Sequence, residues 1–152
     1  MKWFLKIIAC AFFVLGSGNS SADTLNDGLE AFTAGKFEKA NIIFETLAKS
    51  GNPSAQFQLG LSYELGRGLE KSDVLAVKWF EAAARQELPL ACLHLGMFYE
   101  AGRGVNRDYV RAYKLYEIAG SRASTDTNRK AAEKKRDYVL KKMTPLERAR
   151  AR

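Results

Sequence analysis

The sequence contains little material for catalytic chemistry. His94 is the only histidine, so a Ser-His-Asp or Cys-His site would have to use it. Cys92 precedes it by two residues on the same predicted helix, and side chains at that spacing point to different faces. We interpret Cys92 as a packed small residue and His94 as a groove or surface residue. With two cysteines and one histidine we predict no zinc cluster, no metal and no cofactor.

Two further features resemble chemical motifs but favour structural roles. Glu64 and Glu100 occupy equivalent places 36 residues apart, and we expect them on a solvated helix face rather than in acid/base catalysis. Glycines alternate with another residue at 66–68 and 102–104, but a phosphate-binding loop requires a preceding strand, and none is predicted. The residues therefore indicate that the protein is not an enzyme.

The first 22 residues have the pattern of a secretory signal peptide. Lys2 and Lys6 precede the apolar run from Ile7 to Leu15, and Ser20-Ser21-Ala22 offers a cleavage site before Asp23. Nine apolar residues are far fewer than the roughly 20 that a membrane anchor needs. A lipoprotein signal would end its apolar run at Cys10, but here the run continues. We expect cleavage near Ala22 and an exported protein, periplasmic or secreted, whose single cysteine cannot form an internal disulfide.

The positive charge is concentrated in the C-terminal tail. The 152 residues carry a net charge of +7, and residues 121–152 alone carry eleven Lys/Arg against four Asp/Glu. One interpretation is the solvated outer face of a capping helix. The other is weak contact with an anionic envelope surface or an acidic partner. We do not expect nucleic acid as a ligand, because an exported protein would rarely meet it.

An internal repeat organises the middle of the chain. Residues 55–90 shifted by 36 positions onto 91–126 give thirteen identities, among them Leu59/Leu95 and Gly60/Gly96. Each unit reads as a helical hairpin. Ala55, Leu59 and Tyr63 form one helical stripe, and Gly60 beside it leaves room for a neighbouring helix. Gly66 and Gly68 end that helix, Ser72 or Asp73 caps the next, and Asp108 does so in the second copy.

Weaker elements flank the two units. Gly28, Gly35, Ala40, Phe44 and Ala48 mark a further hairpin upstream. Downstream we predict an amphipathic helix over 127–143, with Ala131, Ala132, Tyr138, Val139 and Met143 available for packing. Thr144-Pro145-Leu146-Glu147 is a capping box that starts a last short helix. The predicted divisions are a signal peptide (1–22), a first hairpin (23–51), two repeats (52–88 and 89–120) and basic capping helices (121–152).

The pattern Ala-x3-Leu-Gly-x2-Tyr-x2-Gly-x-Gly, followed by Ala-x3-[Phe/Tyr]-x2-Ala, resembles the Sel-one-like repeat, a relative of the tetratricopeptide repeat. Residues 52–120 match it twice, and residues 25–51 look like a plain tetratricopeptide repeat. The resemblance implies an all-α solenoid of stacked hairpins that acts as a protein-binding scaffold. Some cysteine-rich secreted members bind or hydrolyse β-lactams, but this chain lacks a cysteine pair in each repeat.

The resemblance also suggests which residues bind a partner. If the first helix of each hairpin lines the concave surface, residues off the core stripe face a groove that suits an amphipathic helix or extended peptide. An alternative left open is that the apolar ones pack between adjacent inner helices. We predict a non-catalytic scaffold of the bacterial cell envelope; a cell-wall or β-lactam hydrolase is the alternative, by family analogy only. The candidate partner-binding residues are Phe57, Gln58, Leu61, Glu64, Leu93, His94, Met97 and Glu100.

Overall fold

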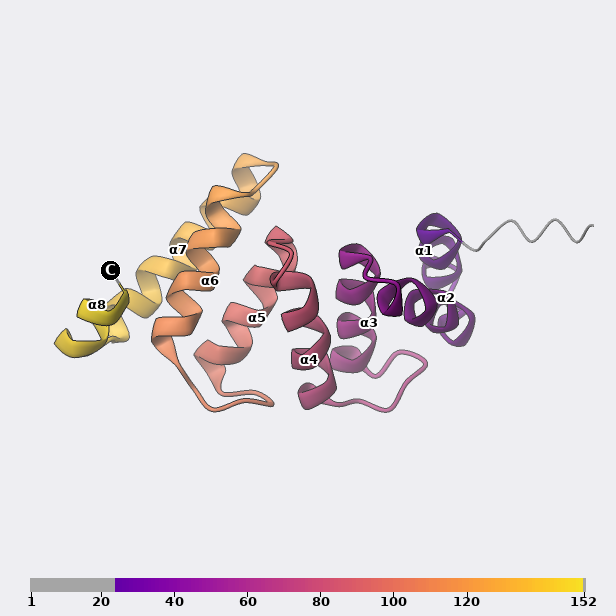
Figure 1. The fold of residues 1–152 in the computed structure, drawn as a ribbon, viewed down its shortest axis with the longest axis horizontal. Helices are drawn as coiled ribbons and strands as arrows, with labels where there is room; N and C mark the ends of the chain where they lie inside the picture. Colours follow the sequence, from indigo (N-terminus) through magenta and orange to yellow (C-terminus); the bar gives the residue numbers. More distant parts are fainter. Residues whose placement is uncertain (1–23, 152) are drawn as a thin grey trace, which may run out of the picture.

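The computed structural model describes residues 24–151, which form eight α-helices and contain no strand. Figure 1 shows the helices following one another along the long axis, from α1 at one end to α7 and α8 at the other. The predicted signal peptide lies outside the described residues. The helices are α1 Leu25–Thr33, α2 Phe37–Lys49, α3 Pro53–Leu65, α4 Asp73–Ala84, α5 Pro89–Ala101, α6 Tyr109–Ser121, α7 Asp126–Lys142 and α8 Pro145–Ala151.

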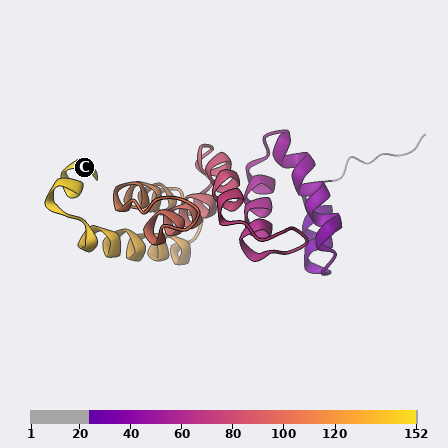
Figure 2. The same ribbon diagram turned by 90° about the horizontal axis from the view of Figure 1, so that it is seen from below.

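Each helix packs on the helix before it and the helix after it, up to α7, and α8 packs back on α6. This order of contacts makes a row of stacked hairpins, so the predicted all-α solenoid is confirmed. Figure 2 shows α8 turning away from α7 at the C-terminal end of the row. A single hairpin cannot bury its apolar face alone, and stacking supplies the missing surface.

Side-chain caps and glycines set the helix boundaries. Ser72 rather than Asp73 caps α4, since its hydroxyl accepts the Leu75 N–H, and Asp108 caps α6 in the same way through the Arg111 N–H. Gly66 and Gly102 end α3 and α5 with φ of +67° and +70°. A residue with a Cβ is strained in this left-handed conformation, which is why glycine recurs here.

Small residues allow the two helices of each hairpin to approach closely. A Cβ on Gly60 would lie 2.6 Å from the ring of Phe80, and one on Gly96 would lie 2.6 Å from the ring of Tyr116. Gly28 faces Phe44 in the first hairpin in the same way. The expected role of Gly60 is therefore confirmed: one large aromatic of the second helix fills the space over a glycine of the first.

The two C-terminal helices lie close to where the sequence predicts them, but one face of α7 is more exposed than expected. Helix α7 buries Ala132 and Val139, and Met143 is buried just after it. Tyr138 and Ala131, which we predicted to be available for packing, are exposed, because the described residues place no helix over this side of α7. The capping box of α8 is confirmed: the Thr144 N–H donates to Glu147 Oε2 at 2.7 Å and the Glu147 N–H to Thr144 Oγ1 at 3.2 Å.

None of the helices within residues 24–151 combines the length and the apolar character needed to cross a membrane.

Candidate binding surface

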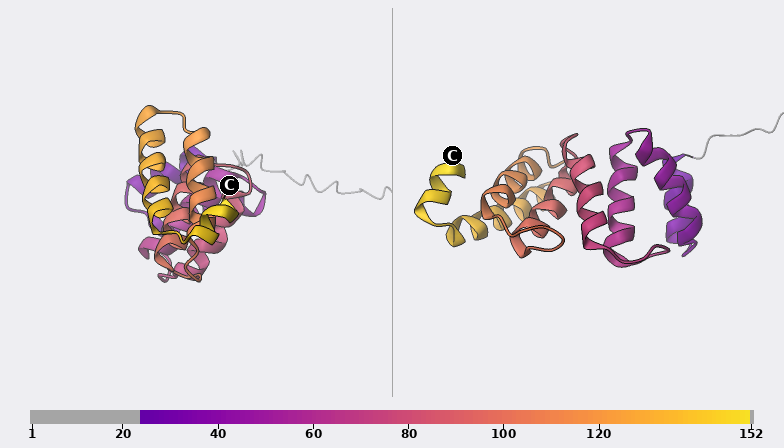
Figure 3. Two further views of the ribbon diagram at one scale, coloured as in Figure 1. Left: turned by 90° about the vertical axis from the view of Figure 1, so that its left-hand side faces the viewer. Right: turned by 60° about the horizontal axis from the view of Figure 1, so that its bottom comes forward.

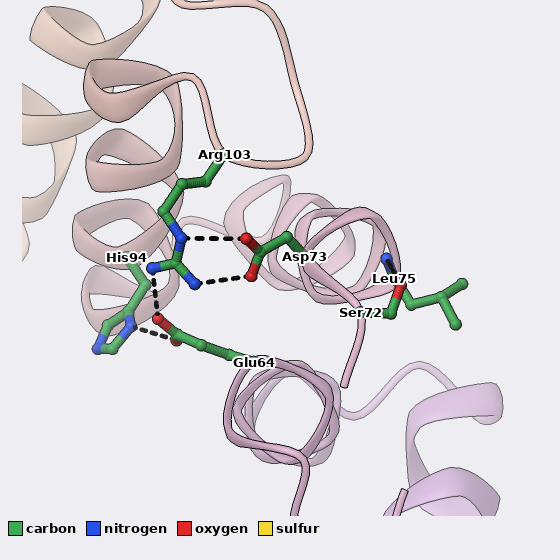
Figure 4. Close-up of polar contacts among 6 residues, drawn as sticks. All are labelled: Glu64, Ser72, Asp73, Leu75, His94 and Arg103. Carbon is green, nitrogen blue, oxygen red and sulfur yellow. Dashed lines mark hydrogen bonds and ion pairs between the residues drawn. The ribbon is translucent and has the colours of Figure 1, made fainter. Parts of the chain in front are cut away.

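An ionic cluster joins the two central hairpins (Figure 4). Arg103 follows the glycine that ends α5, and its guanidinium donates to both carboxylate oxygens of Asp73, at 3.1 and 2.6 Å. Its third contact is with Glu64 Oε1 at 3.1 Å. Arg103 holds the pKa of Asp73 below its ordinary value, mainly through these hydrogen bonds. The cluster therefore connects three elements: the ends of α3 and α5 and the start of α4.

The cluster also positions His94. Its Nδ1 lies 3.4 Å from Glu64 Oε2, and its ring lies 5.2 Å from that of Phe57 and 5.4 Å from that of Phe80, between centroids. His94 is thus half-buried between aromatic rings at the interface of α3 and α5, and is no isolated surface residue. Its carboxylate and aromatic neighbours account for its position without any catalytic role.

The prediction that Glu64 and Glu100 lie on a solvated face is wrong. The side chain of each is only 16% exposed. Glu100 accepts a hydrogen bond from Tyr116 Oη at 2.5 Å and lies 3.3 Å from Lys135 Nζ on α7. Each glutamate therefore links its own helix to the next odd-numbered helix, which explains why it recurs in the repeat.

The second glycine of each loop does more than interrupt the helix. Gly104 lies against the start of α4, where a Cβ would come 2.6 Å from the backbone carbonyl of Asp73. Gly68 lies likewise against Phe37 at the start of α2, and the Asn41 side chain donates to the Arg67 carbonyl at 2.7 Å. The loop of each repeat is thus docked on the preceding hairpin. Neither this contact nor the role of Arg103 was predicted from the sequence, although Gly-Arg-Gly recurs at 66–68 and 102–104.

Cys92 is fully buried, and burial raises the pKa of its thiol to about 11. Its Sγ lies 3.9 Å from the carbonyl oxygen of Ala84. A thiol in this environment stays protonated near neutral pH and is a poor nucleophile. Among residues 24–151, no three His, Cys, Asp or Glu side chains gather closely enough to hold a metal ion.

The register of α7 follows from its contact with α5. His94 on α5 approaches Glu64 of α3, and Lys135 on α7 approaches Glu100 of α5. Because the two glutamates are equivalent in the repeat, Lys135 takes the position of His94. His94 and Lys135 are 41 residues apart, whereas the repeat length is 36. The difference arises because α7 has an extra turn before Lys135 and because α6 is one residue longer than α4. Tyr138 on α7 therefore takes the position of Met97 on α5.

This register aligns one stripe on three helices. Each stripe has residues at i, i+4 and i+8, which share one helix face. The aligned triplets are Phe57, Leu61 and Leu65 on α3; Leu93, Met97 and Ala101 on α5; and Lys134, Tyr138 and Lys142 on α7.

The predicted partner-binding residues differ in exposure. Phe57 is only 7% exposed and packs against the rings of Phe80 and His94. It therefore packs between neighbouring helices, as the alternative interpretation stated, and offers no surface to a partner. Leu61, Leu93 and Gln58 are half-buried. Met97 is exposed, at 39%. Two residues that are not among the predicted ones are exposed as well: Leu65 at 51% and Tyr138 at 47%. We call the set Leu61, Leu65, Leu93, Met97 and Tyr138 the apolar band.

The end of the band borders a hollow on α7. This hollow has a volume of about 510 Å³ and is lined by Glu100 of α5 and by four residues of α7: Ala131, Lys134, Lys135 and Tyr138. Its walls therefore mix an aromatic ring with ammonium groups, and its carboxylate is engaged by Tyr116 and Lys135.

These features define a helical-hairpin repeat protein. Residues 53–88 and 89–124 each match the Sel1 repeat, so the chain contains two Sel1 repeats and the resemblance of the glycine and alanine pattern is confirmed. Proteins with Sel1 repeats generally serve as protein-interaction scaffolds. A search of the curated proteins finds no match.

Two solved structures are similar in fold and sequence. One is c5321, a protective antigen present in uropathogenic Escherichia coli strains that displays an SLR fold; it has 31% identity and a TM-score of 0.77 over 84% of this chain and 27% of its own. The other is a Sel1 repeat protein from Oxalobacter formigenes, with 33% identity and a TM-score of 0.69 over 78% of this chain and 47% of its own. The chain thus spans less than half of either relative.

Proposed function

We propose that the protein is a non-catalytic scaffold of the bacterial cell envelope that binds a segment of a partner protein along the apolar band. The observation that carries this proposal is the alignment of half-buried or exposed apolar side chains on three successive odd-numbered helices. Leu61, Met97 and Tyr138 take equivalent places on α3, α5 and α7, so together they offer a continuous apolar track to an extended or helical segment.

The residues of the band suit a binding surface. Tyrosine supplies a large contact area at a modest cost in rotamer entropy, and the flexible side chain of Met97 can adapt to a partner's shape. Polar groups border the track: Gln58 is half-buried beside Leu61, and Lys134 is exposed beside Tyr138. Apolar residues at the centre with polar residues at the edge are typical of protein interfaces.

We do not propose hydrolase activity. The thiol of Cys92 is buried with a raised pKa, and His94 is engaged by Glu64 and by two aromatic rings. The structure therefore offers no support for the alternative that rested on family analogy.

Site-specific photo-cross-linking in living cells tests the proposal. A photoreactive amino acid at Met97 should capture a discrete partner, whereas the same group at Ile42, which is 66% exposed on α2, should not. Replacing Tyr138 with alanine should reduce the yield at position 97. Equal capture at positions 42 and 97, or capture at 97 that is insensitive to Tyr138→Ala, would contradict the proposal. Phe57→Ala is unsuitable here, because a buried residue tests folding.

A further inference from the structure

We infer that the partner segment is acidic where it crosses α7, and that Lys134 and Lys142 bind its carboxylates. The inference rests on the proposed function and adds the chemistry of the partner. Its starting point is the change of residue type at equivalent positions. The triplets on α3 and α5 are wholly apolar, whereas on α7 a lysine replaces the first and third residues and only the central one stays apolar.

The two lysines lie on the same face of α7 as Tyr138, one turn before it and one turn after it. Lys142 Nζ lies 5.4 Å from the centre of the Tyr138 ring. Lys134 and Tyr138 both line the hollow of about 510 Å³ that continues the apolar band. A segment that follows the band from α3 to α7 would therefore meet an aromatic ring with an ammonium group on either side.

Neither of these lysines forms an ion pair within the described part of the chain. Lys135, the neighbour of Lys134, pairs with Glu100, and Arg136 pairs with Asp137. The ion pairs formed by residues 24–151 include neither Lys134 nor Lys142, and both side chains are exposed. An incoming carboxylate would thus gain an ion pair without breaking one, which is the condition for electrostatic selection of a partner.

The direction of the partner follows from the same arrangement. Its apolar side chains lie over Leu61 and Met97, and its carboxylates lie over α7. Figure 3 (left) looks onto the C-terminal end, where α7 and α8 lie in front of the other helices. Tyr138, Lys134 and Lys142 are all exposed, so their face of α7 is open to an approaching segment. An anionic lipid surface would also attract lysines, but it would not require the neighbouring apolar track on α3 and α5.

Selection from a random peptide library on the mature protein tests the inference. Peptides enriched by the wild type should combine apolar residues with Asp or Glu. The double variant Lys134→Glu/Lys142→Glu should bind the selected peptides about fivefold to tenfold more weakly, since two exposed ion pairs become repulsive. The matched control is Lys78→Glu/Lys114→Glu, which makes the same change at two exposed, equivalent positions on α4 and α6 and should leave the affinity unchanged.

The outcomes separate the inference from the proposed function. Selected peptides that need Met97 but lack acidic residues, or that tolerate Lys134→Glu/Lys142→Glu, overturn the inference and leave the scaffold proposal standing. Peptides that are indifferent to Met97→Ala overturn the scaffold proposal itself. Vesicles of phosphatidylcholine and phosphatidylglycerol in equal parts form the third arm. If the double variant loses vesicle binding while peptide binding is retained, the lysines serve a lipid surface and the inference is overturned.

Discussion

At the scale of single residues, the clearest constraint is the contact between Gly60 and the ring of Phe80. Phe80 is fully buried, so its ring cannot move aside when a methyl group is added at position 60. Gly60→Ala should lower the free energy of unfolding by about 1–3 kcal/mol.

The chain provides a matched control for that prediction. Gly120 lies in α6 with ordinary helical geometry, and a Cβ there would meet its nearest neighbour, the Cβ of Ala132, at 3.7 Å. Gly120→Ala should be neutral or stabilising by up to about 1 kcal/mol, because alanine favours the helix. Urea titration measures both. Equal losses at the two positions would show that close packing over Gly60 is not the cause.

Arg103 is the second residue for which a prediction follows. Arg103→Ala removes the ion pairs with Asp73 and Glu64 and the contact of the guanidinium with Phe98, 4.3 Å from the ring centre. Because the Arg103 side chain is 38% exposed, solvent screens part of the ion-pair attraction. We therefore expect the substitution to lower the free energy of unfolding by about 1 kcal/mol. Arg85→Ala, at an exposed position, should cost little.

The pH dependence of that loss has a defined sign. The pKa of Asp73 is lower in the folded protein than in the unfolded chain, so its contribution is complete above the unfolded pKa of about 4. It disappears as the pH falls through the folded value. The stability difference between wild type and Arg103→Ala should therefore shrink at acid pH in urea titrations. A difference that grows below pH 4 would contradict the role of Asp73.

At the scale of the helices, the small residues of the second helix determine how closely each hairpin packs. Ala76 on α4 and Ala112 on α6 are fully buried at equivalent positions, whereas Lys78 is exposed on α4. Ala76→Leu and Ala112→Leu should each cost about 1–3 kcal/mol by overpacking a helix contact. Lys78→Leu should change the stability by less than about 0.5 kcal/mol. Thermal and urea unfolding compare the three variants, and a loss at Lys78 as large as at Ala76 would contradict this account of the packing.

At the scale of the whole molecule, the solenoid divides its surface between structure and binding. The ionic clusters at Glu64 and Glu100 join successive hairpins, while Lys134, Lys142 and the outer residues of the apolar band, Leu65, Met97 and Tyr138, remain exposed. Mutations at the clusters should therefore lower stability, and mutations at the band should lower binding. This separation allows the binding surface to be tested by substitutions that leave the fold intact.

We also propose that the chain is exported and that its mature form begins near Asp23. The support is the order of Lys2 and Lys6, the apolar run from Ile7 to Leu15, and Ser20-Ser21-Ala22. Mass spectrometry of the natural protein should give a chain without residues 1–22. Detection of the intact N-terminus, or of a lipid on Cys10, would contradict the proposal.

The amino-acid sequence by itself determined the repeat unit, the fold class and most of the helix ends. These features depend on local chemistry: a glycine at a left-handed position, a serine or aspartate at a cap, a small residue every few positions on a stripe. They recur every 36 residues, so each copy supports the interpretation of the other.

Only the tertiary structure decided which side chains face a neighbour and which face solvent. Phe57 and Leu65 belong to one stripe of α3, yet Phe57 is covered by Phe80 and His94 while Leu65 is exposed. Glu64 and Tyr138 differ from the predictions in opposite ways. Glu64, expected on a solvated face, lies in an ion cluster, whereas Tyr138, expected to be available for packing, is exposed. Helical periodicity defines a stripe, but burial depends on the next helix in the stack. The extra turn of α7 and the extra residue of α6 together shift the register of α7 by five residues, so no fixed spacing of 36 could align Tyr138 with Met97.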